Sequence, residues 1–311
     1  MTDWIGGYEQ LTEMQTVGSG SARWCIAQKN GQRFFVKEFL SPVYPFENSE
    51  PALAERKRKR CKEFEGQKQR LYTALNCVIG ETLVPVLDFF RHEGKYYAVS
   101  EEVPHPYKNG EEVGQLSIRE TREALYLLAQ CLQRLHVQGI VHADLKPEHL
   151  QFTGTAGNYN LRLIDLDSGF LEDEPPTEQR EIEGDPVYLA PETFLCLMGE
   201  KITLTSKVDT FALGILIHRL WTGKLPIFDT QKYTYLYEAS LMDGEIRLLP
   251  TLPVAYRFCV QQMLRREPDE RPSDEEVVQL LSAPKEEPAP LAKSGEDIGP
   301  INGLSRFMKK K

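Results

Sequence analysis

The stretch GIVHADLKPEHLQF, residues 139–152, constrains this 311-residue chain more than any other. Directly after an apolar pair, it brings together His142, Asp144, Lys146 and His149. Proteins use carboxylates, ammonium groups and imidazoles to move protons and to stabilise developing charge. We therefore interpret this stretch as a candidate catalytic loop.

The chain has a β-rich part followed by a helical part. Residues 11–40 contain short β-type runs, and the turn Lys-Asn-Gly-Gln at 29–32 is a hairpin signal. A helical pattern follows at 51–75, then two more strand-like runs, and helices dominate from Ser117 onward. This order indicates an α+β chain. Its length allows one large two-lobed unit or two domains.

Composition and charge exclude several classes of protein. The formal net charge of −9 argues against a general nucleic-acid binder and against an anionic-membrane binder. Six cysteines without a C-x-x-C pair indicate reduced thiols rather than a zinc site or a disulfide framework. The N-terminus shows no signal-peptide pattern, and the most apolar stretch, 211–221, is about half the length that spans a bilayer. We expect a cytoplasmic protein that contacts neither nucleic acid nor membrane.

Two segments stand apart from this composition. Residues 56–62 form a basic run, which we interpret as a solvated helix face, with a docking patch as the alternative. Residues 284–311 are rich in Pro, Gly and charge and lack sustained periodicity. We expect them to form a flexible tail, with a short docking segment in GLSRFMKKK at 303–311 as the alternative.

The β-rich part contains two candidate phosphate-binding features. Gly18, Ser19 and Gly20 form a glycine turn between expected strands, where a missing Cβ lets backbone N–H groups approach phosphate oxygens. An ordinary hairpin is the alternative. Lys37 follows three apolar residues at the end of the next strand, so its ammonium is a candidate to hold phosphates; a surface lysine is the alternative.

Four further motifs follow the candidate catalytic loop in order: LIDLD at 163–167, GDPVYLAPE at 184–192, VDTFALG at 208–214 and RPS at 271–273. Together with the loop, they resemble the H-R-D-L-K-P-E-N, D-F-G, A-P-E, D-x-W-x-x-G and R-P-[ST] elements of the Ser/Thr protein kinases. The resemblance extends over roughly residues 10–283. It implies a bilobal protein-kinase-like fold, with a β-rich N-lobe at 1–102 and a mainly helical C-lobe at 103–283.

The resemblance also implies ATP in the cleft between the lobes, together with Mg²⁺ or Mn²⁺. Asp144 would orient the substrate hydroxyl and accept its proton, and Lys146 would neutralise the γ-phosphoryl oxygens. Asp165 would bind the metal that bridges the phosphates. Ser100 would border the rear of the nucleotide pocket, and the hinge from Glu101 to Val103 would follow it.

Four other residues take structural roles in the resemblance. Glu192 and Arg271 would form a buried ion pair that braces the substrate lobe. Asp209 would tie the candidate catalytic loop to the start of a helix, and His142 would be a structural residue of that loop.

Two departures from the family concern regulation. Ala143 stands where many members have an arginine that receives a phosphorylated activation-loop residue. Residues 168–183, here called the activation segment, carry only Ser168 and Thr177 as hydroxyl residues among many acids, which would repel added negative charge. We expect activity that does not depend on an activation-loop phosphate.

Three departures lie at the expected metal and phosphate site. His149 replaces the asparagine that would bind a second metal, which suggests manganese-favoured or one-metal catalysis; a histidine that only hydrogen-bonds the loop is the alternative. Asp167 replaces the glycine of D-F-G and adds a second acid near the metal. Asp185 replaces a threonine, and its carboxylate could pair with Lys146 or pull that lysine off the phosphate.

The expected helix acid that pairs with Lys37 is missing. Two alignments of the 51–75 helix place Gln67 or Lys68 there, and Glu63, one turn earlier, is a possible substitute. The partner of Lys37 therefore stays open. Nearby, the small side chain of Ser100 predicts an open rear pocket and sensitivity to bulky adenine-like inhibitors.

The sequence thus favours an ATP-dependent Ser/Thr protein kinase that transfers the γ-phosphate to a protein hydroxyl. A pseudokinase that acts as a scaffold or allosteric partner is the alternative, because of the departures at the active site. A small-molecule phosphotransferase is a third interpretation, against which the A-P-E and R-P-S elements argue. The protein substrate, the regulator and the oligomeric state stay open.

Overall fold

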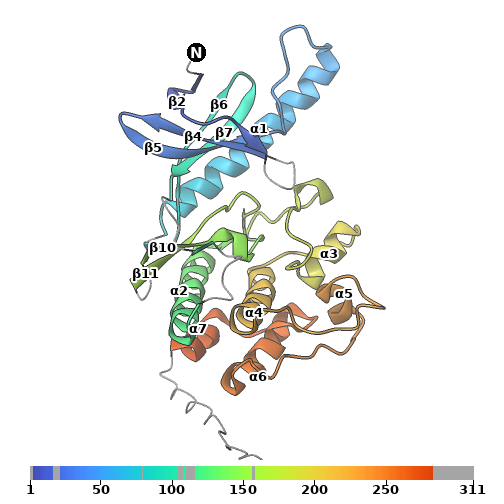
Figure 1. The fold of residues 1–311 in the computed structure, drawn as a ribbon. Helices are drawn as coiled ribbons and strands as arrows, with labels where there is room; N and C mark the ends of the chain where they lie inside the picture. The colour runs from blue at the N-terminus through green and yellow to red at the C-terminus, as the bar shows by residue number, and fades with distance from the viewer. Residues whose placement is uncertain are drawn as a thin grey trace, which may run out of the picture.

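The computed structural model describes residues 3–16, 22–78, 80–103, 108–109, 116–155 and 158–282. A β-sheet with one long helix forms the N-lobe, and a mainly helical C-lobe lies below it (Figure 1). The expected bilobal α+β fold is confirmed. The glycine turn at 18–20 and the tail at 284–311 lie outside the described residues.

The N-lobe sheet is antiparallel, with strand order β1-β2-β4-β5-β7-β6, and β3 pairs with β4. The turn between β4 and β5 contains Asn30 with a φ of 54° and Gly31 with a φ of 78°, which fits the hairpin signal in the sequence. The strands are β1 (Trp4–Ile5), β2 (Tyr8–Gln10), β3 (Gln15–Thr16), β4 (Ala22–Lys29), β5 (Gln32–Phe39), β6 (Val86–His92) and β7 (Lys95–Glu101).

The alternation of side chains along β5 places Lys37 on the cleft side of this sheet. Phe34 and Val36 are buried in a small core on the outer face, together with residues of β1, β2, β4 and β7. Phe35 and Lys37 therefore point to the opposite face, because successive strand residues alternate. Lys37 lies opposite Ala98 of β7, and Phe35 lies opposite Ser100.

Helix α1 (Pro51–Leu75) packs one face against the sheet and leaves the other in solvent. Phe64 contributes to an aromatic cluster with Phe39, Phe89 and Tyr96, at ring-centroid distances between 5.2 and 6.2 Å. The cations of the basic run at 56–62 are all exposed along the helix. This exposure agrees with a solvated helix face and leaves a docking role untested.

The C-lobe is built around helices α2 and α4. Helix α2 begins with a capping box between Ser117 and Glu120 and is followed by Gly139, which has a φ of 67°. Helix α4 is buried on almost every side, which explains its continuously apolar sequence. Among the described residues, no helix is long and apolar enough to cross a membrane. The helices are α2 (Ile118–Val137), α3 (Pro191–Leu197), α4 (Lys207–Thr222), α5 (Leu236–Leu241), α6 (Val254–Met263) and α7 (Asp274–Ser282).

Short strands of the C-lobe position the candidate site. In the β10–β11 hairpin, Leu150 pairs with Leu163, so the segments before β10 and after β11 emerge at the same end. Phe170 of β12 pairs with Val141 of β9, which holds the start of the activation segment against the candidate catalytic loop. These strands are β8 (Lys108–Asn109), β9 (Ile140–Val141), β10 (Leu150–Thr155), β11 (Asn158–Leu163) and β12 (Phe170–Leu171).

Candidate active site

The candidate catalytic loop is held from below by the buried carboxylate of Asp209 at the start of α4. Its Oδ2 accepts a hydrogen bond from the backbone N–H of His142 at 2.7 Å, and its Oδ1 accepts one from that of Ala143 at 2.8 Å. Ala143 has a φ of 65°, which L-residues seldom adopt unless surrounding contacts hold them there. Asp209 supplies those contacts.

His136 of α2 connects this anchor to a second carboxylate. Its Nε2 lies 3.0 Å from Asp209 Oδ2, and its Nδ1 lies 2.7 Å from Asp274 Oδ2 of α7. Burial opposes protonation of the ring, but hydrogen bonds to the two carboxylates outweigh it and raise the pKa of His136 to about 9. The imidazolium therefore lies between two acids at neutral pH. No motif in the sequence marked this residue.

Asp144 lies at the centre of the loop, with both carboxylate oxygens engaged. Lys146 Nζ donates to Oδ2 at 2.7 Å, and the backbone N–H of Asp185 donates to Oδ1 at 2.9 Å. The side chain of Asp185 instead accepts from the backbone N–H of Val187 at 2.8 Å. The carboxylate of Asp185 therefore stabilises the turn at residues 185–187, and the backbone N–H of Asp185 orients the carboxylate of Asp144.

Lys37 faces two acids that come from the segment after β11. Its Nζ lies 2.9 Å from each carboxylate oxygen of Asp165 and 2.5 Å from Asp167 Oδ2. Burial opposes the charge of this ammonium, but Asp167 and Asp165 outweigh it and hold the pKa of Lys37 above its ordinary value. Lys37 is thus a fully charged cation at the meeting point of the lobes.

Helix α1 contributes two side chains to this cluster, and neither is an acid. The ammonium of Lys68 donates to the backbone carbonyl of Asp167, and the Tyr72 hydroxyl donates to Asp167 Oδ1 at 3.0 Å. Burial lowers the pKa of Lys68. Glu63, the substitute that the sequence left open, is exposed and lies 3.9 Å from Lys59 on the same helix.

His149 is buried beside Asp144, the candidate base, and Asp165, the candidate metal ligand. Its Nδ1 lies 2.8 Å from the backbone carbonyl oxygen of Asp144, so this nitrogen carries the proton, and Nε2 lies 3.5 Å from Asp165 Oδ2. Burial lowers the pKa of His149 to about 4, which keeps the ring neutral. The lone pair of Nε2 therefore faces a carboxylate oxygen, an arrangement that a bound cation would stabilise.

The donor set fits a divalent metal that is shared with a nucleotide. Among the described residues, no group of three His, Cys, Asp or Glu side chains is placed to hold a metal ion. Asp165 and His149 would therefore supply two ligands, and phosphate oxygens would complete the shell.

The hinge residues lie beside the cleft at the end of β7. Ser100 and Glu101 belong to β7, Val103 follows it, and Arg162 of β11 forms an ion pair with Glu101. Phe35 lies cross-strand from Ser100, and its ring stacks on Trp24 at a centroid distance of 5.3 Å. The small side chain of Ser100 therefore has a large aromatic neighbour on the same face of the sheet.

Glu192 and Arg271 meet in the interior of the C-lobe, far from each other in the sequence. Arg271 donates two hydrogen bonds to the Glu192 carboxylate, at 2.6 and 2.7 Å, and both side chains are almost fully buried. The guanidinium also donates to backbone carbonyls of Lys207, Arg265 and Arg266. The pair thus joins α3, the start of α4 and the segment after α6.

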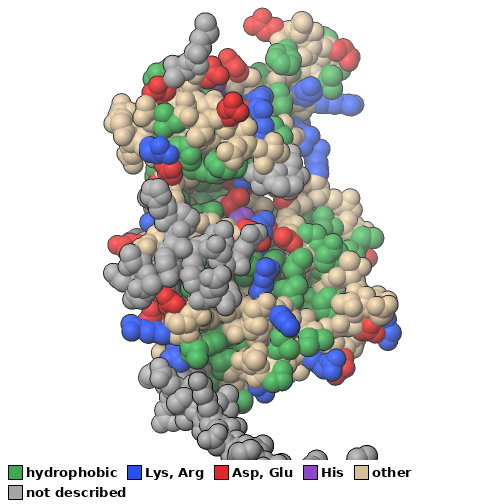
Figure 2. Space-filling model, in the orientation of Figure 1, with side chains coloured by type: hydrophobic (Ala, Val, Ile, Leu, Met, Phe, Trp, Pro, Cys, Tyr) green, Lys and Arg blue, Asp and Glu red, His purple; other side chains and the backbone are tan. Residues whose placement is uncertain are grey.

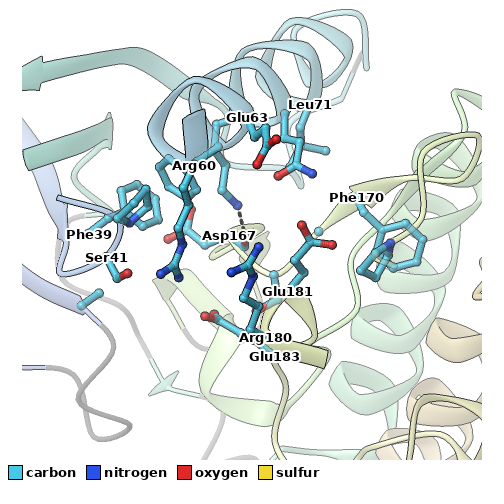
Figure 3. A pocket seen from close by; sticks show the side chains of 18 of the residues that line it. Phe39, Ser41, Arg60, Glu63, Leu71, Asp167, Phe170, Arg180, Glu181 and Glu183 are labelled. Atoms are coloured by element: carbon cyan, nitrogen blue, oxygen red, sulfur yellow. Dashed lines mark hydrogen bonds between the residues drawn. The ribbon is translucent and has the colours of Figure 1, made fainter. Parts of the chain in front are cut away.

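The activation segment and α1 enclose a cavity of about 380 Å³ (Figure 3). Arg60 and Glu63 of α1 face Arg180, Glu181 and Glu183 of the activation segment across it, and Lys37, Lys68 and Asp167 also line it. Basic, acidic and histidine side chains meet between the lobes in the space-filling view (Figure 2). The hinge residues 100–103 do not line this cavity.

The comparisons with known proteins decide the family. A model of the protein kinase domain matches residues 18–281. The chain belongs to the protein kinase family. This match spans most of both lobes, from the glycine turn to helix α7.

Similar curated proteins are kinases of several kinds. The serine/threonine-protein kinase PkaA of Streptomyces coelicolor is 33% identical over 155 residues, which cover 50% of this chain and 27% of the relative. The phosphorylase b kinase gamma catalytic chain, liver/testis isoform, of Bos taurus is 28% identical over 259 residues, 79% of this chain and 59% of the relative. The Wee1-like protein kinase of Oryza sativa is 32% identical over 179 residues, 57% of this chain and 31% of the relative. The chain therefore spans between 27% and 59% of these relatives.

Proposed function

We propose that this chain is an ATP-dependent Ser/Thr protein kinase that transfers the γ-phosphate to a protein hydroxyl. One observation carries the proposal: Lys37 from the N-lobe meets Asp165 at 2.9 Å, Lys146 meets Asp144 at 2.7 Å, and the ring of His149 lies between the two pairs, within 3.8 Å of both acids. These are the cation, the base and the metal ligand that phosphoryl transfer requires. The similarity to PkaA supports a serine or threonine acceptor.

Asp144 is suited to act as the catalytic base. The N–H of Asp185 and the ammonium of Lys146 fix the orientation of its carboxylate, which is 10% exposed. A substrate hydroxyl that hydrogen-bonds to this carboxylate would transfer its proton there as its oxygen bonds to the γ-phosphorus and the bond from that phosphorus to the β,γ-bridging oxygen breaks, which releases ADP. Lys146 can turn from Asp144 toward the transferred group, because an ammonium on a flexible stem serves several acceptors.

Asp165 and His149 would hold the metal that accompanies ATP. A divalent metal bound here would offset the negative charge of the phosphates during transfer. Lys37 would hold the α- and β-phosphates, and the glycine turn at 18–20 would cover them. Because His149 offers a nitrogen where magnesium prefers oxygen, we propose manganese-favoured catalysis.

Activity independent of an activation-loop phosphate is supported by the contacts that the activation segment already makes. Glu172 accepts a hydrogen bond from the backbone N–H of Ser206 at 2.7 Å, and Glu174 pairs with Arg70 of α1 at 2.7 Å. These carboxylates attach the segment to both lobes without an added phosphate. Ala143 offers no guanidinium to receive one.

A nucleotide-binding pseudokinase is the second candidate function. Lys37 is bound to both oxygens of Asp165, so this pair must open before ATP and metal can bind. A protein that keeps the pair closed would act as a scaffold or allosteric partner. A small-molecule phosphotransferase is less favoured, because the relatives are protein kinases. We also propose a cytoplasmic location, since all six cysteines are free.

Transfer of labelled γ-phosphate from ATP, to the chain itself and to a generic basic protein, tests the proposal. We expect Asp144→Asn to lower transfer about a hundredfold or more, since general base catalysis contributes that much. Asp173→Asn, which removes an exposed carboxylate from the activation segment, is the matched control and should leave transfer unchanged. Absence of transfer from a parent protein that binds ATP would contradict kinase activity and favour the pseudokinase.

The same assay with Mg²⁺ or Mn²⁺ tests the role of His149. We expect the parent to favour Mn²⁺ and His149→Asn to shift the preference toward Mg²⁺, because an amide oxygen replaces a nitrogen ligand. An equal ratio of the two activities in parent and variant would assign His149 to the loop structure alone.

A further inference from the structure

Lys37 needs a fixed anionic partner if it is to hold phosphates in one place, because a lysine side chain is long and flexible. Helix α1 does not supply that partner. Where α1 lines the cavity it offers Glu63, Gln67 and Lys68, and Glu63 is exposed and lies 3.9 Å from Lys59. An acid from another element must therefore take this position.

We propose that Asp167 is the positioning residue that orients Lys37 toward the nucleotide phosphates. This inference rests on the proposed function of the site and names the residue that completes it. Asp167 Oδ2 lies 2.5 Å from Lys37 Nζ, and the two side chains are only 12% and 13% exposed. An ion pair at this depth is weakly screened by solvent and holds its geometry.

Asp165 is the less suitable partner, although it also contacts Lys37. Its carboxylate faces His149 as well as Lys37, and it is the acid that would bind metal. Metal binding would withdraw that carboxylate from Lys37. Asp167 lies two residues later and would still contact Lys37 when Asp165 binds the metal. Lys37 would therefore keep one acidic partner while it binds the phosphates.

Helix α1 fixes Asp167 at two points. The Tyr72 hydroxyl donates to Oδ1 at 3.0 Å, which leaves Oδ2 to Lys37, and the ammonium of Lys68 donates to the carbonyl of the same residue. Lys68 and Tyr72 are one helical turn apart and share a face of α1. In this protein the helix therefore positions the acid instead of carrying it.

The backbone on the other side of Asp167 is also fixed. A Cβ on Gly169 would lie 2.8 Å from the carbonyl oxygen of Val141, so the chain passes close to β9 at this point. The close approach and the contacts from α1 confine Asp167 from both sides. A glycine two residues after Asp167 makes this path possible.

Lys68 and Asp167 lie close enough for the acid to be moved from position 167 to position 68. Burial and the charge on Lys37 disfavour the ammonium of Lys68, and the charges of Asp167 and Asp165 favour it. The cavity between α1 and the activation segment is lined by Lys37, Lys68 and Asp167, so it can accept a carboxylate from position 68. A glutamate there would restore the acid to the helix.

Three variants test the inference: Asp167→Asn, Lys68→Glu with Asp167→Asn, and Asp173→Asn. The last is the matched control, since it removes an exposed acid of the activation segment that does not line the cavity. We would measure the affinity for a fluorescent ATP analogue with Mn²⁺, the KM for ATP, kcat, and the melting temperature. Affinity reports on Lys37 without requiring turnover.

We expect Asp167→Asn to weaken nucleotide affinity and to raise the KM for ATP, each by about tenfold, because one of the two acids that form ion pairs with Lys37 loses its charge. The melting temperature should stay within a few degrees, because Asp165 still pairs with Lys37. The double variant should recover most of the affinity, and Asp173→Asn should resemble the parent.

Unchanged affinity and KM in Asp167→Asn would overturn the inference. So would a loss that Lys68→Glu does not repair and that accompanies a large drop in melting temperature, because Asp167 would then be a structural residue only. If the parent transfers no phosphate, kinase activity fails, but the affinity measurements still decide whether Asp167 orients Lys37.

Discussion

His136 lies between two carboxylates on different helices, Asp209 of α4 and Asp274 of α7. Asp209 also holds the backbone N–H groups of the candidate catalytic loop. A charge on His136 therefore fixes the anchor on which Asp144 depends. The ring is only 5% exposed, so its two partners are weakly screened.

The pH dependence of stability follows from this arrangement. The pKa of His136 is raised to about 9 in the folded chain, so its contribution is complete below its ordinary value near 6.5 and is lost as pH rises through about 9. We expect His136→Gln to lower the free energy of unfolding by about 3 kcal/mol at pH 6.5. Melting temperatures of parent and variant should converge between pH 7 and 10. A difference that stays constant over this range would contradict a charged His136.

Still at the scale of single residues, the motifs predict the candidate site residues but not the neighbouring residues that hold them in place. Lys37, Asp144, Lys146 and Asp165 were predicted, and the structure brings them together. His136 was missed because it lies within an amphipathic helix, where a polar residue needs no explanation. The partner of Lys37 was open because Asp167 reaches it only through the fold.

At the scale of the elements, strand β5 changes the interpretation of the small side chain of Ser100. Ser100 alone predicts an open rear pocket beside the nucleotide. Phe35 lies directly across the strand pair and stacks on Trp24, so an aromatic pair covers the adjoining part of the cleft face. A rear pocket beside Ser100 would therefore have Phe35 as a side wall, which the serine alone does not indicate.

Bulky adenine-like inhibitors test this wall. We expect Ser100→Met to weaken inhibition and Phe35→Ala to strengthen it, each by about tenfold, the effect of filling or opening space for one large apolar group. Phe34→Leu, on the opposite face of the same strand, is the matched control. Inhibition constants that do not change in Ser100→Met would show that Ser100 does not border the nucleotide.

The elements themselves were largely predictable, and their pairing was not. The hairpin at 29–32 and the stop at Gly139 follow from local turn and capping chemistry, and the 51–75 helix follows from the spacing of its apolar residues. The pairing of β9 with β12 joins segments about thirty residues apart and depends on tertiary packing. The position of the activation segment therefore required the structure.

At the scale of the whole molecule, Arg271 connects helices that lie far apart in the chain. Its guanidinium binds the carboxylate of Glu192 and three backbone carbonyls, those of Lys207, Arg265 and Arg266. The motifs predicted an ion pair between Glu192 and Arg271. They gave no indication of the three carbonyls, because backbone acceptors leave no signal in the sequence.

The four acceptors predict how two variants of this pair differ. Glu192→Gln leaves a buried guanidinium without its acid and should destabilise the fold by about 3–5 kcal/mol. Arg271→Met should cost more, because it leaves the buried Glu192 carboxylate without its cation and removes one donor from each of three backbone carbonyls. Chemical denaturation would give both free energies, and Glu267→Gln, which removes an exposed acid nearby, is the control.

Because the pair lies within the C-lobe, the KM for ATP of folded Glu192→Gln should match that of the parent. A larger loss in Glu192→Gln than in Arg271→Met would mean that the carbonyls contribute little and that the carboxylate pair alone holds these helices together.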